Sequence, residues 1–284
     1  LFYFITGLWI WKKNGQNRHI RISLAYVIMI ILIWIPMARR KSLAFLDVGQ
    51  GDCFVADTKS GAIIFDGGSS SEDQVGRYRI LPYMKYLGYQ KIQIAVISHM
   101  DIDHYSGIKE LLEMGKIKYL GLPEIPKDET MKKIIGIAKK RGTTIFYLSR
   151  GRQITTKDGS LKVLHPQKNS QMEKNVASLV MQGKILGYRV LLTGDVEKEG
   201  EEELLSEELE RADILKAAHH GSKNSTSNEF LQKVQPKQTV ISCGKQNRYG
   251  HPHLETIHRL QTYRTKIYRT DRSGAIIFFK RRDG

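Results

Sequence analysis

The stretch that decides the fold is SHMDIDHYSG, residues 98–107, which follows directly on the apolar run IAVI. It places four potential metal ligands in six consecutive positions, namely His99, Asp101, Asp103 and His104, in a chain with only 9 histidines. A buried strand that ends here and a helix that begins near His104 would aim these side chains at one point. The alternative is a helix cap, in which the aspartates only accept hydrogen bonds from backbone N–H groups.

Two further predicted strands end in residues of the same kind. In GYRVLLTGDVEKEG (187–200) an apolar run ends at Gly194-Asp195, and in ADILKAAHHGSKNSTS (212–227) another ends at His219-His220. A lone aspartate at a strand end is usually a turn residue. Three strand ends that all carry His or Asp can instead bring these side chains together at one edge of a sheet sandwich. We therefore expect a site for two metal ions a few ångströms apart, as in many enzymes that cleave phosphoesters.

Composition limits the range of partners. The 284 residues are 41% hydrophobic, enough for one substantial core, but 45 Lys+Arg against 29 Asp+Glu give a net charge of +16. Such a surplus favours polyanionic partners, either nucleic acid or anionic lipid, with a merely solubilising surface as the alternative. Cys53 and Cys243 lie in apolar runs and are predicted to be buried small hydrophobic residues, not a disulfide framework or a zinc knuckle.

The first 41 residues have a different pattern from the rest. Residues 1–11 resemble the tail of a membrane helix, a basic link follows at 12–21, and ISLAYVIMIILIWIPMA (22–38) is just long enough to span a bilayer. A buried core helix is the alternative. Since the chain begins with Leu1, we expect it to be part of a longer protein. The basic residues before and after the span favour a cytoplasmic link and a C-terminal domain on the extracellular face of a cell membrane.

From residue 42 onward, short β-branched runs alternate with amphipathic stretches. The early strands, at 42–49, 53–57, 62–68 and 94–99, come nearly back to back, with helices at 75–87 and 104–114. Later strands are predicted at 144–148, 161–164, 177–182, 188–193, 213–217, 238–242, 267–270 and 275–280. The helices between them are predicted at 128–141, 196–208, 227–235 and 253–262. This order indicates an α+β fold, a two-sheet sandwich with helices outside, formed by residues 42–284.

The order of motifs resembles a known family. HxDxDH with YSG, then TGD, then HHGS, is similar to the metallo-β-lactamase fold, an αββα sandwich of binuclear hydrolases. LDVGQGDC, IIFDGG and NRYGHPH resemble one branch more closely, the C-terminal domain of the ComEC family of bacterial competence DNA-uptake channels. The resemblance covers about residues 42–281. It implies DNA as partner, bound as a single strand and without sequence preference, together with the bilayer and the membrane channel part of the same longer chain.

The resemblance also implies a set of metal ligands. His99 and Asp101 would hold the first ion, Asp103 and His104 the second, and Asp195 both. His219 or His220 would close the site, and the sequence leaves open which. The family usually carries His where this chain has Asp101, and its third-motif His has no clear counterpart, since His165 precedes a proline and fits poorly. With more carboxylate and fewer imidazole ligands, we expect two divalent ions, Mn²⁺ first and Zn²⁺ second.

Other motif residues receive less specific roles. Asp47, Asp52 and Asp66 are expected to support the loops under the metals by accepting backbone N–H bonds. The residues expected to meet substrate phosphate are Ser222, Lys223, Arg248, His251 and His253. The residues expected to act in catalysis are Asp103, Asp195, Lys223 and His253. For His251 and His253, which flank Pro252, a turn-forming role is an equal alternative.

The expected function is a metal-dependent nuclease domain that hydrolyses phosphodiester bonds of incoming DNA, degrading the strand that is not transported, with a metal-activated hydroxide. The surplus of Lys and Arg supports DNA, because phosphate contacts supply most sequence-independent affinity. One alternative keeps the hydrolase and changes the substrate to a lactam, thioester or small phosphoester. Another drops catalysis and leaves a degenerate, DNA-guiding module of the channel.

Overall fold

The structure, a computed structural model, describes residues 18–34, 40–173, 175–207 and 209–281. The chain divides into two compact units, Leu1–Arg40 and Lys41–Gly284. In the first unit the described residues form one helix, α2 (Arg18–Trp34). Among the described residues, no helix has both the length and the apolar character that crossing a bilayer requires. The predicted membrane-helix tail at 1–11 and the last residues of the predicted span lie outside the described residues, so both membrane segments stay predictions.

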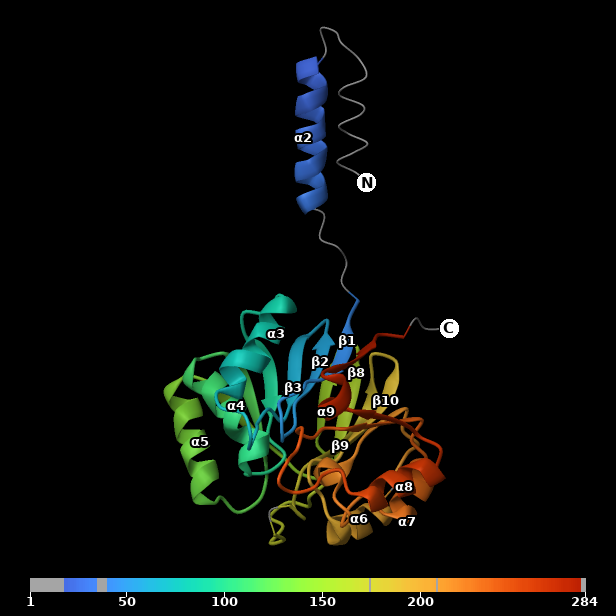
Figure 1. Cartoon of the computed structure of the whole chain (residues 1–284). Helices are drawn as coiled ribbons and strands as arrows, with labels where there is room; N and C mark the ends of the chain where they lie inside the picture. The colour runs from blue at the N-terminus through green and yellow to red at the C-terminus, as the bar shows by residue number, and fades with distance from the viewer. Residues whose placement is uncertain (1–17, 35–39, 174, 208, 282–284) are drawn as a thin grey trace. The chain divides into compact units, whose positions relative to one another are not determined.

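The second unit contains two seven-stranded sheets (Figure 1). The first has the order β14-β1-β2-β3-β4-β5-β6, so the last strand of the chain completes the sheet that the first strand begins. Its strands are β1 (Ser42–Phe45), β2 (Phe54–Thr58), β3 (Gly61–Phe65), β4 (Ile92–Val96), β5 (Ile117–Pro123), β6 (Thr144–Leu148) and β14 (Ile276–Phe279). The second sheet, of order β13-β12-β11-β10-β9-β8-β7, is built from β7 (Gln153–Thr156), β8 (Gly159–His165), β9 (Val180–Ile185), β10 (Tyr188–Leu192), β11 (Ile214–Lys216), β12 (Gln238–Ile241) and β13 (Lys266–Arg269).

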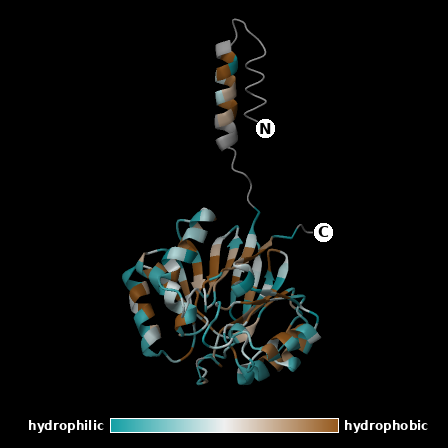
Figure 2. Cartoon of the chain, viewed as in Figure 1, coloured by the Kyte–Doolittle hydropathy of each residue, from teal (hydrophilic) through white to brown (hydrophobic). Residues whose placement is uncertain are grey.

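Helices cover the outer faces of both sheets (Figure 1). The first sheet carries η1 (Gly76–Ile80), α3 (Leu81–Tyr86), α4 (Ile102–Glu113) and α5 (Glu129–Lys140). The second carries α6 (Lys198–Leu205), η2 (Ala218–Gly221), α7 (Asn228–Val234) and α8 (Leu254–Thr262), and α9 (Thr270–Ser273) precedes β14. Apolar residues gather on the strands and polar residues on the outer helix faces (Figure 2).

Three apolar clusters hold these layers together. One contains residues of both sheets, such as Phe45 and Val190, and therefore lies between them. The other two pack helices on a sheet: Ile64 with Leu111 on one side, Leu215 with Phe230 on the other. Burial of these large side chains is the main stabilising contribution to such a sandwich. The predicted αββα architecture is confirmed.

Strands β5 and β7 are not anticipated by the sequence analysis. Strand β5 reads IKYLGLP and contains a glycine and a proline, both of which are depleted in strands. The sheet requires the glycine, because a Cβ at Gly121 would lie 2.9 Å from the Phe146 ring. The glycine in β5 is thus explained by the close approach of a neighbouring strand, which the local sequence pattern does not reveal.

The pairing of the strands positions the site. Strands β3 and β4 are parallel in the first sheet, and β10 and β11 are parallel in the second. Within each parallel pair the carboxyl ends lie at one edge, where open α/β sheets bind ligands. Asp66, the 98–107 stretch, Asp195 and His219-His220 each follow the carboxyl end of one of these four strands.

Candidate metal centre

The stretch 98–107 forms the turn from β4 into α4. Asp101 is the residue before the helix, with an extended backbone (φ −102°, ψ 148°), and its side chain makes no capping hydrogen bond. Its backbone C=O instead accepts from the N–H groups of His104 and Tyr105. The helix-cap alternative for the Asp101 side chain is therefore wrong. Asp103 and His104 lie in the first turn of α4.

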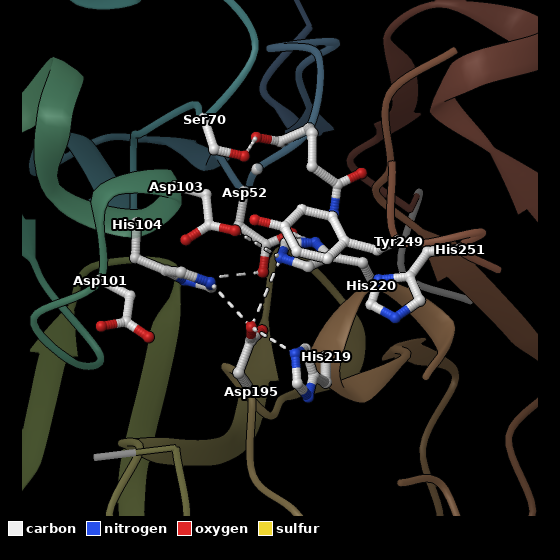
Figure 3. A network of polar contacts seen from close by, with 12 residues as sticks. Asp52, Ser70, Asp101, Asp103, His104, Asp195, His219, His220, Tyr249 and His251 are labelled. Atoms are coloured by element: carbon white, nitrogen blue, oxygen red, sulfur yellow. Dashed lines mark hydrogen bonds and ion pairs between the residues drawn. The ribbon is translucent and has the colours of Figure 1, made fainter. Parts of the chain in front are cut away.

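Four side chains from both sheets meet in the inner group, defined as Asp103, His104, Asp195 and His220 (Figure 3). Asp195 Oδ2 lies 3.2 Å from His104 Nε2 and 3.4 Å from His220 Nε2. His220 Nε2 also lies 3.4 Å from Asp103 Oδ2. The structure therefore brings together residues that lie more than a hundred positions apart in the chain.

The inner group fits a metal ion. His104 Nε2, His220 Nε2 and Asp195 Oδ1 are buried and lack a hydrogen-bond partner within the described part of the chain. With bonds of about 2.0–2.2 Å, the donors around a tetrahedral ion are separated by roughly 3.3–3.6 Å, close to the separations found here. Buried polar atoms left without partners are otherwise costly. A divalent ion would satisfy the two imidazole nitrogens and would meet Asp195 at Oδ2, while Oδ1 faces Lys216.

The outer pair, His99 and Asp101, lies next to the inner group. The ring centroids of His99 and His104 are 4.1 Å apart, and His99 Nε2 lies 3.6 Å from Asp101 Oδ2. His99 Nε2 is also buried without a hydrogen-bond partner, while the side chain of Asp101 is 41% exposed. A second ion would therefore find one imidazole and one carboxylate here.

Two groups behind the imidazoles, Asp66 and the Ser242 C=O, hold them in orientation. Asp66 accepts from the backbone N–H of Ser98 at 2.7 Å through Oδ1, and its Oδ2 lies 2.9 Å from His104 Nδ1. His220 Nδ1 donates to the C=O of Ser242 at 2.9 Å. Each contact engages Nδ1 and leaves Nε2 for Asp195, which is the usual way in which proteins orient metal-binding imidazoles.

Asp52 is a possible metal ligand by distance alone, because one potential ligand atom from each of Asp52, His104, Asp195 and His220 lies within 4.8 Å of the others. Its contacts place it in the supporting layer instead. It faces the Nδ1 sides of His104 and His220, at 3.8 and 3.5 Å. Its carboxylate is ion-paired with Lys216, so we assign it to support instead of to the ligand set. The sequence analysis expects it to accept backbone N–H bonds, whereas its main partner is this ammonium.

Lys216 is a residue of the site that the sequence analysis missed. It is 4% exposed, and its ammonium contacts Asp52, the Gly194 C=O at 3.0 Å and Asp195 Oδ1 at 3.6 Å. It therefore neutralises two of the buried acids and holds one oxygen of Asp195. A signal was present, because a lysine inside the apolar run ADILKAA is rarely buried without an acidic partner.

The electrostatics of the site follow from this crowding of charges. Burial opposes ionisation, yet His104, His220 and Lys216 hold the pKa of Asp195 well below its ordinary value. Burial likewise opposes the charged imidazoles, but the surrounding carboxylates, Asp195 first, raise the pKa values of His104 and His220 well above 6.5. Without a bound ion, the acids of the site therefore retain protons on these two histidines.

The structure distinguishes His219 from His220. His220 is buried and belongs to the inner group, whereas the His219 side chain is 23% exposed, with Nδ1 2.9 Å from Glu197 and Nε2 3.8 Å from Asp195. Both residues adopt left-handed conformations, at φ 47° and 52°. Such strain costs about 1–3 kcal/mol per residue and persists where a functional site requires it.

A cleft of about 310 Å³ opens over the inner group, which is the size of a small-molecule site. Of the predicted phosphate-binding residues, His251 lines it, and Arg248 lies at its rim with the guanidinium 4.9 Å from the Tyr249 ring. Burial, and then the histidines around it, lower the pKa of His251 to about 4, so its ring is neutral near pH 7. It is suited to hydrogen bonding rather than to donating a proton from imidazolium.

Lys223, Ser222 and His253 lie outside the residues that line this cleft. Lys223 lines a neighbouring polar cavity together with Glu197 and Arg259. The backbone N–H of Lys223 donates to His253 Nδ1 at 3.2 Å. The ring centroids of His253 and His251 are 4.9 Å apart. Ser222 is buried, and its hydroxyl accepts from a backbone N–H in the same turn. These contacts stabilise the loop that carries the histidines.

Asp47 and His165 support neighbouring segments. Asp47 accepts from the backbone N–H of Gly49 at 3.2 Å, as expected of a loop-fixing residue. His165 is buried and donates through Nδ1 to the Ser178 C=O at 3.0 Å. The Ser178 hydroxyl lies 3.2 Å from His99 Nδ1, so His165 reaches the site through this serine. Its Nε2 lies 3.6 Å from Glu203 Oε2, so His165 does not supply the missing third-motif ligand.

The sandwich of two sheets and the His/Asp cluster at one edge define a class of metal-dependent hydrolases. The chain belongs to the metallo-beta-lactamase superfamily, whose family profile matches residues 46–245. A solved structure of the metallo-beta-lactamase fold protein YhfI from Bacillus subtilis aligns with 83% of this chain and 99% of its own, at 12% identity and a TM-score of 0.56. At that identity the likeness shows the fold alone.

Two curated relatives are competence proteins. ComE operon protein 3 of Bacillus subtilis is 35% identical, and the match covers 91% of this chain and 35% of the relative. Competence protein ComA of Neisseria gonorrhoeae is 30% identical, with 84% of this chain and 32% of the relative covered. The chain thus spans about a third of the length of these relatives.

Proposed function

We propose that this chain is a metal-dependent nuclease domain of a competence DNA-uptake channel of the ComEC family and hydrolyses phosphodiester bonds of incoming DNA. The observation that carries the proposal is the inner group, in which two buried Nε2 atoms face Asp195 Oδ2 in an open cleft. The competence relatives support DNA as the substrate, and so does the net charge of +16.

The site would hold two divalent ions, one in the inner group and one at the outer pair. Three imidazoles and three carboxylates make up this donor set. It contains more hard oxygen ligands than a set in which a histidine replaces Asp101. We therefore favour Mn²⁺, with Zn²⁺ as the alternative. Ions bound there supply Lewis-acid activation of water and of the scissile phosphate.

The chain's own residues perform the remaining tasks. Asp66, Asp52 and Lys216 keep the ligands in a fixed orientation. Little reorganisation of the site is therefore needed when negative charge develops on the phosphate oxygens in the transition state. Arg248 at the rim and neutral His251 inside the cleft can donate hydrogen bonds to phosphate oxygens. The other Lys and Arg side chains supply attraction to the phosphate backbone without sequence preference.

In this proposal the domain works next to a membrane. Residues 1–41 would belong to the membrane channel part of the same longer chain, with residues 42–284 on the extracellular face, where DNA enters. The strand that is degraded would be the one that is not transported. Basic residues on both sides of residues 22–38 support this orientation.

A second candidate is a DNA-guiding module without catalysis. The outer pair favours it, because His99 and Asp101 lack the nitrogen ligand of the family's third motif, and His165 does not replace it. Such a module would bind DNA through its positive charge and leave it intact.

One experiment separates the two candidates. After chelation and addition of Mn²⁺, Zn²⁺ or Mg²⁺ singly, the purified chain is incubated with single- and double-stranded DNA, and released nucleotides are measured. We expect cleavage with Mn²⁺, lost in Asp103→Ala with DNA binding retained. Asp73→Ala, which removes an exposed aspartate outside the cleft, is the matched control. Binding without cleavage by the parent chain under every metal would instead establish the guiding module.

A further inference from the structure

Ile102 is an unusual residue in the metal-binding stretch. It stands between Asp101 and Asp103, lines the metal cleft, and is 54% exposed. The neighbouring buried residues of α4, such as Ile108 and Leu111, pack into the core of the first sheet instead. An apolar side chain held at the mouth of a charged site offers a ligand something that carboxylates and imidazoles do not.

Tyr249 is the second exposed apolar side chain of the same cleft, at 43% exposure (Figure 3). Its ring is nearly parallel to that of His251, with the centroids 5.7 Å apart and an interplanar angle of 22°. The Arg248 guanidinium lies 4.9 Å from the Tyr249 centroid, and its Nη2 donates to the Tyr249 hydroxyl at 2.7 Å. The phenol ring is therefore held by these two contacts and is still accessible to solvent.

The loop that carries Tyr249 is ordered by one side chain. Asn247 donates through Nδ2 to the C=O groups of Gly244 and His251, at 3.0 and 2.6 Å. Its Oδ1 accepts from the N–H groups of Tyr249 and His251, at 3.2 and 3.0 Å. Four hydrogen bonds from one residue hold the aromatic ring at the cleft before any ligand arrives, which lowers the entropic cost of binding.

We infer that Ile102 and Tyr249 form a clamp for one nucleobase of single-stranded DNA beside the scissile phosphate. This inference rests on the proposed function and adds how a base of the single strand is held. The faces of a base are flat and apolar, and proteins bind unstacked bases on aromatic and aliphatic side chains next to cationic groups. In a duplex these faces are covered by neighbouring bases, so the clamp selects a single strand.

The charge around the clamp agrees with a nucleotide. Arg248 stands beside Tyr249 and can meet the phosphate of the base that the ring holds. The cleft floor carries the metal ligands, where the next phosphate would lie. A purely apolar ligand would leave the Arg248 charge unused, and a duplex would present phosphates without an accessible base.

The test is a binding measurement that does not depend on cleavage. Fluorescence anisotropy in EDTA compares a labelled oligothymidylate with a strand of equal length in which abasic sites replace every internal nucleoside. We expect the parent chain to bind the strand with bases about tenfold more tightly, since each stacked base contributes about that much. Tyr249→Ala and Ile102→Ser should reduce this ratio towards one, and Tyr249→Phe and Ile102→Leu should preserve it.

The control is Tyr78→Ala, which removes an exposed tyrosine on η1, outside the cleft, and should keep the parent ratio. A parent chain that binds both strands equally, or a Tyr249→Ala chain that loses affinity for both strands alike, would overturn the clamp. Cleavage with Mn²⁺ is measured separately. A base preference without cleavage contradicts the proposed function and leaves the clamp standing, whereas cleavage without a base preference contradicts the clamp alone.

Discussion

The inner group and the outer pair are neighbours, with the His99 and His104 ring centroids 4.1 Å apart, yet the protein supports them very differently. In the inner group, His104 is held by Asp66, His220 by the Ser242 C=O, and Asp195 by Lys216. In the outer pair, His99 Nδ1 contacts the Ser98 and Ser178 hydroxyls, at 3.0 and 3.2 Å, and Asp101 is 41% exposed.

This difference indicates how the two ions would be bound. Ionised and backbone partners orient the inner ligands, and such partners are worth about 10–100-fold in metal affinity. The outer ligands have hydroxyl partners and more contact with water. We therefore expect one tightly held ion in the inner group and one weaker ion whose binding depends more on the metal supplied.

The largest effect is expected from the two adjacent histidines. His220→Ala removes a buried donor of the inner group and should lower hydrolysis by at least about a hundredfold, with loss of about one ion per chain. His219→Ala, at the rim, should lower it by less than about tenfold. Metal content by mass spectrometry and DNA hydrolysis measure both effects, and thermal unfolding checks that each variant folds. Equal losses in the two variants would contradict the assignment of His220.

Lys216→Met tests the support beneath the inner group. It leaves the buried carboxylate of Asp52 without its ammonium, and breaking a buried pair costs about 3–5 kcal/mol in the free energy of unfolding. Urea unfolding measures this cost. The double variant Lys216→Met/Asp52→Asn should recover part of it, because the uncompensated charge is removed. Lys198→Met, at an exposed position, is the control, and a loss below about 1 kcal/mol for Lys216→Met would refute the supporting role.

The pH dependence of stability should change sign when metal is removed. The pKa values of His104 and His220 are raised in the folded, metal-free chain, so their stabilisation is complete below about pH 6.5 and is lost as the pH rises through the raised values. Metal binding, by contrast, strengthens with pH because the ligands must lose protons. The difference in Tm between Mn²⁺-loaded and chelated chains should therefore grow from about pH 6 to about pH 9.

Differential scanning calorimetry measures that difference. The exposed histidine variant His258→Ala should keep the same growth with pH, since His258 lies outside the residues that line the cleft. A difference in Tm that stays constant or shrinks with rising pH would show that His104 and His220 do not carry the competing protons.

The smallest effect is expected at the outer pair. Asp101→His introduces a second imidazole beside His99 and should shift the preference from Mn²⁺ towards Zn²⁺, because imidazole is the softer ligand. The shift should be about tenfold or less, since the side chain is half in water and the inner group is unchanged. Competition binding of the two metals measures it. An unaltered metal preference would remove the donor-set argument for manganese.

Local pattern predicted much of the fold. Apolar runs broken by Gly and Asp placed most of the strands, and the alternation of later strands with helices indicated the sandwich. Strand β5 is not predicted, because Gly121 and Pro123 are residue types that usually interrupt strands. The glycine is required by the neighbouring Phe146 ring, which leaves no room for a Cβ. Contacts between strands that are distant in sequence are absent from any local pattern.

The amino-acid pattern specifies the chemical types of the site: histidines and aspartates at three strand ends, and an acid at position 101. That His220 and not His219 belongs to the inner group follows from the folded backbone, since two consecutive left-handed residues set their directions. The tertiary structure also buried Lys216 beneath Asp195 and brought Tyr249 to the same cleft as Ile102. Residue type follows from composition and spacing, whereas the direction and depth of a side chain depend on long-range packing.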